Sequence, residues 1–110
     1  MGRRHLGEFE QVLLYAVLHL QDDEEPGASG PAIRRTIEAK TNRALSPGAV
    51  YTALSRLETR GFVRSELGEP TAERGGKRKR HYRLRPTGAA ALRAAESALS
   101  RMARLTRAKA

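Results

Sequence analysis

Cysteine and tryptophan are absent from this 110-residue sequence, and its only aromatic residues are three Tyr and two Phe. The lack of cysteine excludes disulfide bonds, zinc sites built on thiolates and a catalytic thiol. Histidine occurs only at His5, His19 and His81, and no two of these share a spacing typical of a metal site or lie near a candidate serine nucleophile. We therefore expect no metal, no cofactor and no enzymatic activity.

Long hydrophobic runs are also missing. The longest apolar stretch, residues 12–20, is too short to span a bilayer and contains His19. The first five residues are basic, but four acidic residues at positions 22–25 stand where a secretory leader would need a small-residue cleavage site. The sequence thus predicts a cytoplasmic protein without a leader.

Positive charge is abundant. The chain has 21 Lys and Arg against 12 Asp and Glu, which gives a net charge of +9 at pH 7. The excess is concentrated in residues 74–85, which include seven basic residues and no acidic one. A solvated basic loop would explain such a run taken alone, but a polyanion such as nucleic acid is the partner that it favours.

Hydrophobic spacing predicts a first helix from Glu8 to Leu20. One face carries apolar residues three and four positions apart, which is the pattern of a helix that packs on a core. Leu14 and Leu18 form a second apolar strip on another side, with Tyr15 beside it. A helix that is apolar on two sides must be covered twice, so we expect a partner subunit to cover the second strip.

Capping residues predict two further helices. Ser29 is a suitable N-cap for the second helix, and Ser46 followed by proline is a suitable start for the third, over residues 47–60. Gly61 suits the end of the third helix. The short connection between these two helices is typical of a helix-turn-helix.

The remaining sequence predicts a hairpin and a final helix. Strands are expected at residues 62–67 and 81–85, joined by a long basic tip, and a helix from Pro86 to about Leu105. The predicted fold class is mainly α with a small β-hairpin. It consists of a winged helix-turn-helix DNA-binding domain over residues 1–85 and a C-terminal dimerisation helix over residues 86–110, which packs on the first helix.

Candidate DNA-binding residues follow from this arrangement. In a helix-turn-helix the second helix presents polar side chains to the major groove, and basic residues of a wing contact phosphates. On the third helix and its N-cap the candidates are Ser46, Gly48, Tyr51, Thr52, Ser55 and Arg56. On the wing they are Lys77, Arg78, Lys79 and Arg80.

A second set of candidates concerns assembly. The final helix has apolar residues at a heptad-like spacing of three, four and three, and a single chain offers them little cover. We expect a two-fold dimer in which this helix packs on the first and final helices of the other subunit. The expected dimerisation residues are Leu14, Leu18, Leu92, Ala95, Leu99 and Met102.

Five sequence segments occur in the order found in a known family. They are Leu6–Glu10, Ser46–Leu54, Arg56–Glu58, Gly61–Val63 and Tyr82–Gly88. The chain resembles the PadR family of winged-helix transcriptional regulators over residues 6–88. The resemblance implies a dimeric repressor, in many members released from its operator by a small effector, and a C-terminal helix that dimerises.

The chain departs from the family pattern at three places. Ser29 stands where the family often has Tyr, Arg85 stands where it usually has Thr, and the acidic loop at 22–25 is longer than expected. The change at Arg85 implies that the cap of the last helix is lost or moved to Thr87. Effector pockets of such dimers use aromatic side chains, and Tyr15 is the only aromatic residue that we nominate for one.

Two classes of function remain open at this stage. The first is a sequence-specific regulator that binds double-stranded DNA at a palindromic operator as a homodimer, with a possible small-molecule effector. The alternative is a winged-helix module that binds RNA or a protein without operator recognition, since its small size and high positive charge fit that as well. A scaffold protein that only dimerises is a further alternative.

Overall fold

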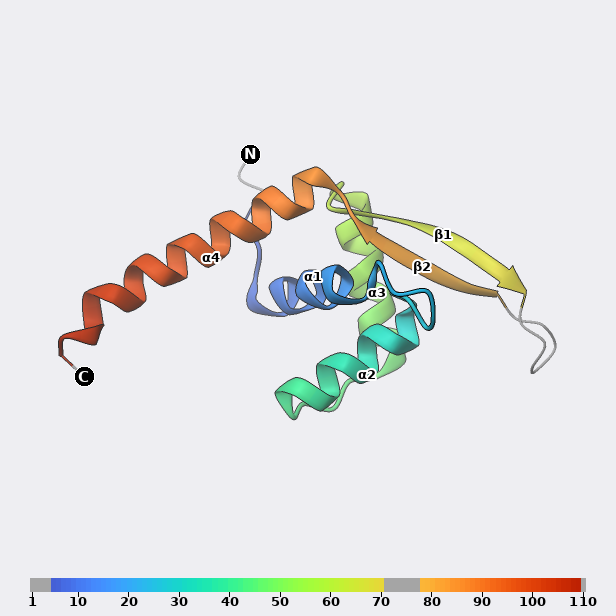
Figure 1. The fold of residues 1–110 in the computed structure, drawn as a ribbon, viewed down its shortest axis with the longest axis horizontal. Helices are drawn as coiled ribbons and strands as arrows, with labels where there is room; N and C mark the ends of the chain where they lie inside the picture. The colour runs from blue at the N-terminus through green and yellow to red at the C-terminus, as the bar shows by residue number, and fades with distance from the viewer. Residues whose placement is uncertain (1–4, 71–77, 110) are drawn as a thin grey trace.

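The computed structural model describes residues 5–70 and 78–109. The elements follow one another as α1 (Glu8–Leu20), α2 (Gly30–Thr41), α3 (Pro47–Thr59), β1 (Val63–Pro70), β2 (Arg78–Leu84) and α4 (Pro86–Arg107). Helix α1 lies at the centre of the fold and contacts α2, α3, α4 and β2. The hairpin and α4 extend from the three-helix body in opposite directions (Figure 1). The predicted fold class, mainly α with a small β-hairpin, is confirmed.

Local capping sets the helix ends as predicted. The hydroxyl oxygen of Ser29 accepts a hydrogen bond from the backbone N–H of Ala32, at 3.3 Å, at the start of α2. Helix α3 ends at Thr59, shortly before Gly61, which has a φ of 84°. This left-handed conformation is readily adopted by glycine and reverses the chain toward the hairpin.

The core gathers the apolar faces of the three body helices. Its most buried side chains include Leu13, Leu14, Val17, Ile33, Ile37, Val50, Leu54, Leu57 and Val63. The prediction that Leu14 forms an uncovered strip with Leu18 is wrong for Leu14. That side chain is fully buried because four elements of the same chain surround α1, whereas Leu18 is 47% exposed.

The hairpin strands are longer than the sequence predicts. Residue Val63 pairs with Leu84 at the base, and the pairing continues to Pro70 and Arg78, with an irregularity after Leu67. The other edge of β2 is also paired, because the N–H of Tyr82 donates to the carbonyl of Ala28 at 3.0 Å. Strand β2 is thus paired on both edges, with β1 of the wing on one side and with the body on the other.

Helix α4 begins against the end of α3. The N–H of Arg85 donates to the carbonyl of Phe62 at 2.9 Å, and the hydroxyl of Thr87 donates to the carbonyl of Gly61. No side chain caps α4 at Arg85, so the expected family cap is lost there. Thr87 fastens the helix to the end of α3 instead.

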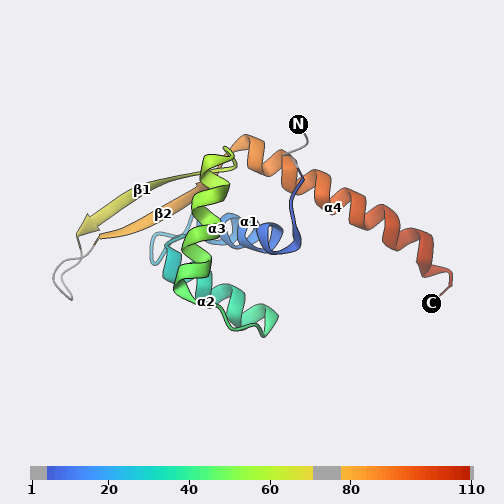
Figure 2. The ribbon, with the colours of Figure 1, turned by 180° about the vertical axis from the view of Figure 1, so that it is seen from behind.

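The first part of α4 packs on α1 of the same chain, and the second part extends away from the body (Figure 2). We expected Leu92 in a subunit interface, but its side chain is 4% exposed within the single chain. The correction has a simple cause: α1 already covers the first turns of α4. Within the described residues, no helix is long and apolar enough to cross a membrane.

Candidate nucleic-acid interface

The predicted reading face of α3 is open. Tyr51 is 60% exposed, Thr52 and Arg56 are exposed, and Ser55 is half-buried. The opposite face is occupied by the buried residues Val50, Leu54 and Leu57. The side chain of Arg56 makes no hydrogen bond or ion pair with any of the described residues. The helix therefore separates into a side that holds the fold and a side that presents polar groups.

The start of α3 is fixed by its cap. The hydroxyl oxygen of Ser46 accepts from the N–H of Ala49 at 3.1 Å, so the side chain that we listed as a DNA contact also stabilises the helix. A Cβ atom placed on Gly48 would meet nothing within 4 Å in the described part of the chain. The fold itself leaves this position open, and an approaching ligand could come close to the backbone there.

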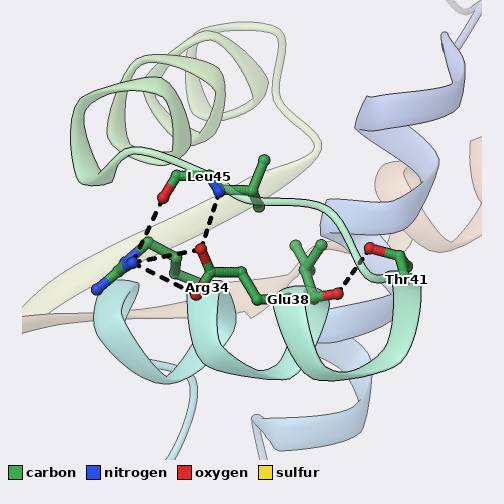
Figure 3. A network of polar contacts seen from close by, with 5 residues as sticks. Arg34, Glu38, Thr41 and Leu45 are labelled. Atoms are coloured by element: carbon green, nitrogen blue, oxygen red, sulfur yellow. Dashed lines mark hydrogen bonds and ion pairs between the residues drawn. The ribbon is translucent and has the colours of Figure 1, made fainter.

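A polar network holds the turn between α2 and α3 (Figure 3). The carboxylate of Glu38 accepts from the N–H of Leu45 at 2.8 Å and contacts the guanidinium of Arg34 at 3.4 Å. The same guanidinium nitrogen of Arg34 donates to the carbonyl of Leu45 at 3.4 Å. Asn42, with a φ of 56°, ends α2 in the left-handed conformation. The network fixes the angle at which α3 leaves the turn.

A second network ties α3 to the wing. The hydroxyl of Ser65 on β1 donates to the carboxylate of Glu58 on α3, at 2.9 Å and 3.0 Å to its two oxygens. The N–H of Ser65 donates to the same carboxylate at 3.2 Å. Arg80 on β2 then donates to the Ser65 hydroxyl at 3.0 Å. Sequence reasoning missed Ser65, because nothing in the local pattern indicates this contact.

The wing cations lie elsewhere than predicted. Arg78, Lys79 and Arg80 belong to strand β2, not to the loop at the tip, because β2 pairs with β1 up to Arg78. Residue Lys77 lies outside the described residues. Alternation along the strand places Arg78 and Arg80 on one face and Lys79 on the other. Arg80 is half-buried and engaged with Ser65, so Arg78 and Lys79 are the more exposed cations.

The second half of α4 carries an exposed apolar seam. Leu99, Met102 and Leu105 are 62%, 60% and 68% exposed, and Ala95 is half-buried. Large apolar side chains in a row on one helix face mark a surface that another molecule covers. We call Ala95, Leu99, Met102 and Leu105 the α4 seam.

The proposed effector residue lines a groove. Tyr15 lies with Val12, His19, Ile37 and other residues around a mainly apolar groove of about 370 Å³ between α1 and α2. Partial burial first, then the negative charge of Glu96 on α4 and a hydrogen bond to it, raise the pKa of the Tyr15 hydroxyl. Within the described residues, no group of three or more His, Cys, Asp or Glu could hold a metal ion.

Comparison with protein families identifies the chain. The model of the transcriptional regulator PadR-like family matches residues 9–94. The chain belongs to the PadR-like family. This family is generally non-enzymatic. The resemblance seen in the sequence is thus confirmed. A search of curated proteins finds no match.

Solved structures share the PadR-like fold. A PadR-like transcription factor from Bacteroides fragilis is 22% identical with a TM-score of 0.70, and the match covers 93% of this chain and 89% of that one. A PadR family regulator from Clostridium difficile is 19% identical with a TM-score of 0.67, over 89% of this chain and 94% of that one. PadR of Bacillus subtilis, solved in complex with operator DNA, is 19% identical with a TM-score of 0.58, over 78% of this chain and 45% of that one.

The family segment Leu6–Glu10 of this PadR-like chain has a structural role. A carboxylate oxygen of Glu10 accepts from the N–H of Gly7 at 2.8 Å, which ties the first turn of α1 back to its N-cap. The other oxygen pairs with Arg60 at 2.7 Å, and Arg60 also donates to the carbonyl of His5 at 2.7 Å. The Arg60 guanidinium lies 4.8 Å from the centre of the Phe62 ring. Through Arg60, the C-terminal end of α3 is thus joined to the residues before α1, to the first turn of α1 and to the start of the hairpin.

Proposed function

We propose that the protein is a sequence-specific regulator of transcription that binds double-stranded DNA with α3 in the major groove. The exposed polar face of α3, opposite its buried stripe, is the observation that carries this proposal. Membership of a family of transcriptional regulators supports it, and so does the likeness to PadR of Bacillus subtilis bound to operator DNA. The net charge of +9 favours the same partner.

Each part of the interface has its own task in this proposal. Tyr51, Thr52, Ser55 and Arg56 read base edges, because the helix in the groove carries the sequence-dependent contacts. The wing cations bind phosphates, which fixes position but carries no sequence information. The link from Glu58 to the wing keeps the two contacts at a constant separation. The protein acts in the cytoplasm, where it meets its operator.

The functional unit is a homodimer that binds a palindromic operator. The α4 seam and the exposed Leu18 of α1 are the apolar surfaces that a second copy would cover. Leu14 and Leu92 no longer belong to this surface, because the chain buries them itself. A two-fold axis would place two copies of α3 about one DNA turn apart, roughly 34 Å.

The regulator acts as a repressor that an effector can release. A small molecule would bind the groove beside Tyr15, between α1 and α2, where most of the lining surface is apolar. The groove borders α2, and Tyr15 interacts with Glu96 of α4. A ligand there would therefore bear on the dimerisation helix and the helix-turn-helix together.

Selection of bound fragments from genomic DNA by the purified protein tests this proposal. We expect one palindrome to be enriched, and the Arg56→Ala variant, which removes an exposed side chain, to lose that enrichment while remaining folded. If no genomic fragment is recovered more often than random fragments at physiological salt, the proposed recognition of DNA is contradicted. A preference for RNA in the same assay would favour the alternative of an RNA-binding module.

A further inference from the structure

A hollow lies beside the reading face of α3. It has a volume of about 250 Å³ and opens between the first turns of α2 and α3. Most of its lining is apolar, and its residues include Gly30, Pro31, Arg34, Pro47, Tyr51 and Tyr82. Tyr51 belongs both to the hollow and to the exposed face of α3. Any DNA that α3 contacts through Tyr51 thus passes the mouth of this hollow.

Among the described residues, Arg34 is the only charged side chain that lines the hollow, and its contacts hold it in one orientation (Figure 3). Its contacts to the Glu38 carboxylate and to the Leu45 carbonyl all use the same nitrogen, Nη1. Within residues 5–70 and 78–109, Nη2 and Nε make no hydrogen bond. A fixed guanidinium with unused donors is well suited to bind an oxyanion, because little side-chain entropy is lost on binding.

The two helix starts at the hollow add to its preference for an anion. Neither α2 nor α3 has an acidic residue in its first turn, although Asp and Glu are favoured there. The partial positive charges of both helix ends are therefore not neutralised by their own side chains. They lie on either side of the hollow, at Gly30 and Pro47.

We propose that Arg34 binds a backbone phosphate of the operator DNA and that the apolar hollow receives the adjoining deoxyribose. Arg34 is then a DNA-contacting residue of α2, outside the reading helix and the wing. Glu38 is a positioning residue, because it holds the Arg34 guanidinium toward the hollow and contacts no DNA. The inference rests on the proposed function, since it requires that α3 binds DNA.

The first test compares two neighbouring arginines. Arg34→Gln keeps an amide that can donate to Leu45 but removes the cation, and Arg35→Gln removes an exposed cation one residue further along α2. We expect Arg34→Gln to weaken binding to operator and random DNA by a similar factor, about tenfold. Its log–log salt dependence should flatten by about 0.9, the slope for one phosphate contact. Arg35→Gln should leave that slope unchanged.

A scan of the operator with neutral methylphosphonate linkages gives a second readout. In each half-site one linkage should weaken binding of the wild-type protein and have no effect on Arg34→Gln. If every linkage that weakens the wild type also weakens the variant by the same factor, Arg34 contacts no phosphate and the inference is overturned. The scan compares a variant with itself on two DNAs, so a general loss of affinity does not imitate the expected result.

Two failures can be told apart. If the wild-type protein binds no DNA, the proposed function fails and this inference fails with it. If the wild type binds but Arg34→Gln and Arg35→Gln show the same salt dependence, only the inference about Arg34 fails. A loss of binding at one operator base, with unchanged affinity for random DNA, would assign Arg34 to base reading and would also overturn it.

Discussion

The first and second halves of α4 differ in what covers their apolar side chains. Leu92 is buried against the body of its own chain, whereas the large side chains of the α4 seam are exposed. Both halves share one continuous spacing of apolar residues, so the spacing does not distinguish them. The comparison teaches that a helical pattern predicts that a face will be covered but does not say by which chain. Changes on covered surfaces should affect folding, and changes on open surfaces should affect binding.

Loss of the dimer should be the largest effect. Leu99→Asp places a charge in the open half of α4, and burial of a leucine contributes about 1.5–3 kcal/mol, counted twice across a two-fold axis. We expect monomers in sedimentation and loss of operator binding, with the helical content unchanged. Leu67→Asp, an equally simple change at an exposed leucine of β1, should leave the dimer intact. A dimer that survives Leu99→Asp would remove the α4 seam from the interface.

The covered half of α4 should respond in folding instead. A Cβ atom on Gly88 would clash with the carbonyl oxygen of Phe62, a contact that requires the backbone to shift. We expect Gly88→Ala to lower the free energy of unfolding by about 3 kcal/mol. Gly30→Ala is the control, because a Cβ there meets nothing within 4 Å in the described residues. Equal denaturation midpoints for the two variants would contradict the close packing of α4 on the backbone of Phe62.

The open face of α3 should affect DNA binding alone. Tyr51→Ala and Arg56→Ala should each weaken operator binding by about 1–3 kcal/mol, because each removes a side chain that reaches a base edge. Their thermal stability should stay that of the wild type, since both side chains are exposed. Titration of labelled operator DNA measures the effect, with Arg35→Ala as control. Wild-type affinity in both variants would place the reading face elsewhere.

The two serine caps offer the same contrast on a smaller scale. Both Ser29 and Ser46 accept a hydrogen bond from a backbone N–H, but Ser29 is fully buried and Ser46 is exposed. Loss of a helix cap costs about 1 kcal/mol. Chemical denaturation should show a larger loss for Ser29→Ala than for Ser46→Ala, because water can replace the missing partner only at the exposed site. An equal loss would mean that burial adds nothing to the cap.

The smallest expected effect appears at alkaline pH. Burial, as the largest cause, raises the pKa of Tyr82 above its ordinary value of 10.0. The unfolded chain loses this proton at lower pH than the folded chain, so stability falls as pH rises above the ordinary pKa toward the raised one. Urea denaturation between pH 9 and pH 11 should show a steeper decline for the wild type than for Tyr82→Phe. Parallel declines would assign the effect to other groups.

Features that depend on neighbouring residues were predictable from the sequence. The caps Ser29 and Ser46 and the stop at Gly61 each act within one helical turn, so the local sequence was enough to locate them. The exposed face of α3 followed as well, because it is the remainder once the apolar stripe is assigned.

Features that depend on distant packing were not predictable. The burial of Leu14 and Leu92 arises from how helices are placed around α1, which no local pattern encodes. The ends of β1 and β2 were missed because pairing between the strands, not alternation of apolar residues, sets their length. The contact from Arg80 to Ser65 spans 15 residues and appeared only once the hairpin was formed.

The start of α4 is fastened to the two residues that follow the end of α3. Thr87 is bonded to the carbonyl of Gly61, and Gly88 packs on the carbonyl of Phe62, so no slack chain separates the helices. At 1.5 Å per residue, the 22-residue α4 is about 33 Å long and the 13-residue α3 about 20 Å. A movement of the free end of α4 would therefore bear directly on the backbone at Gly61 and Phe62, where the chain passes from α3 into the hairpin.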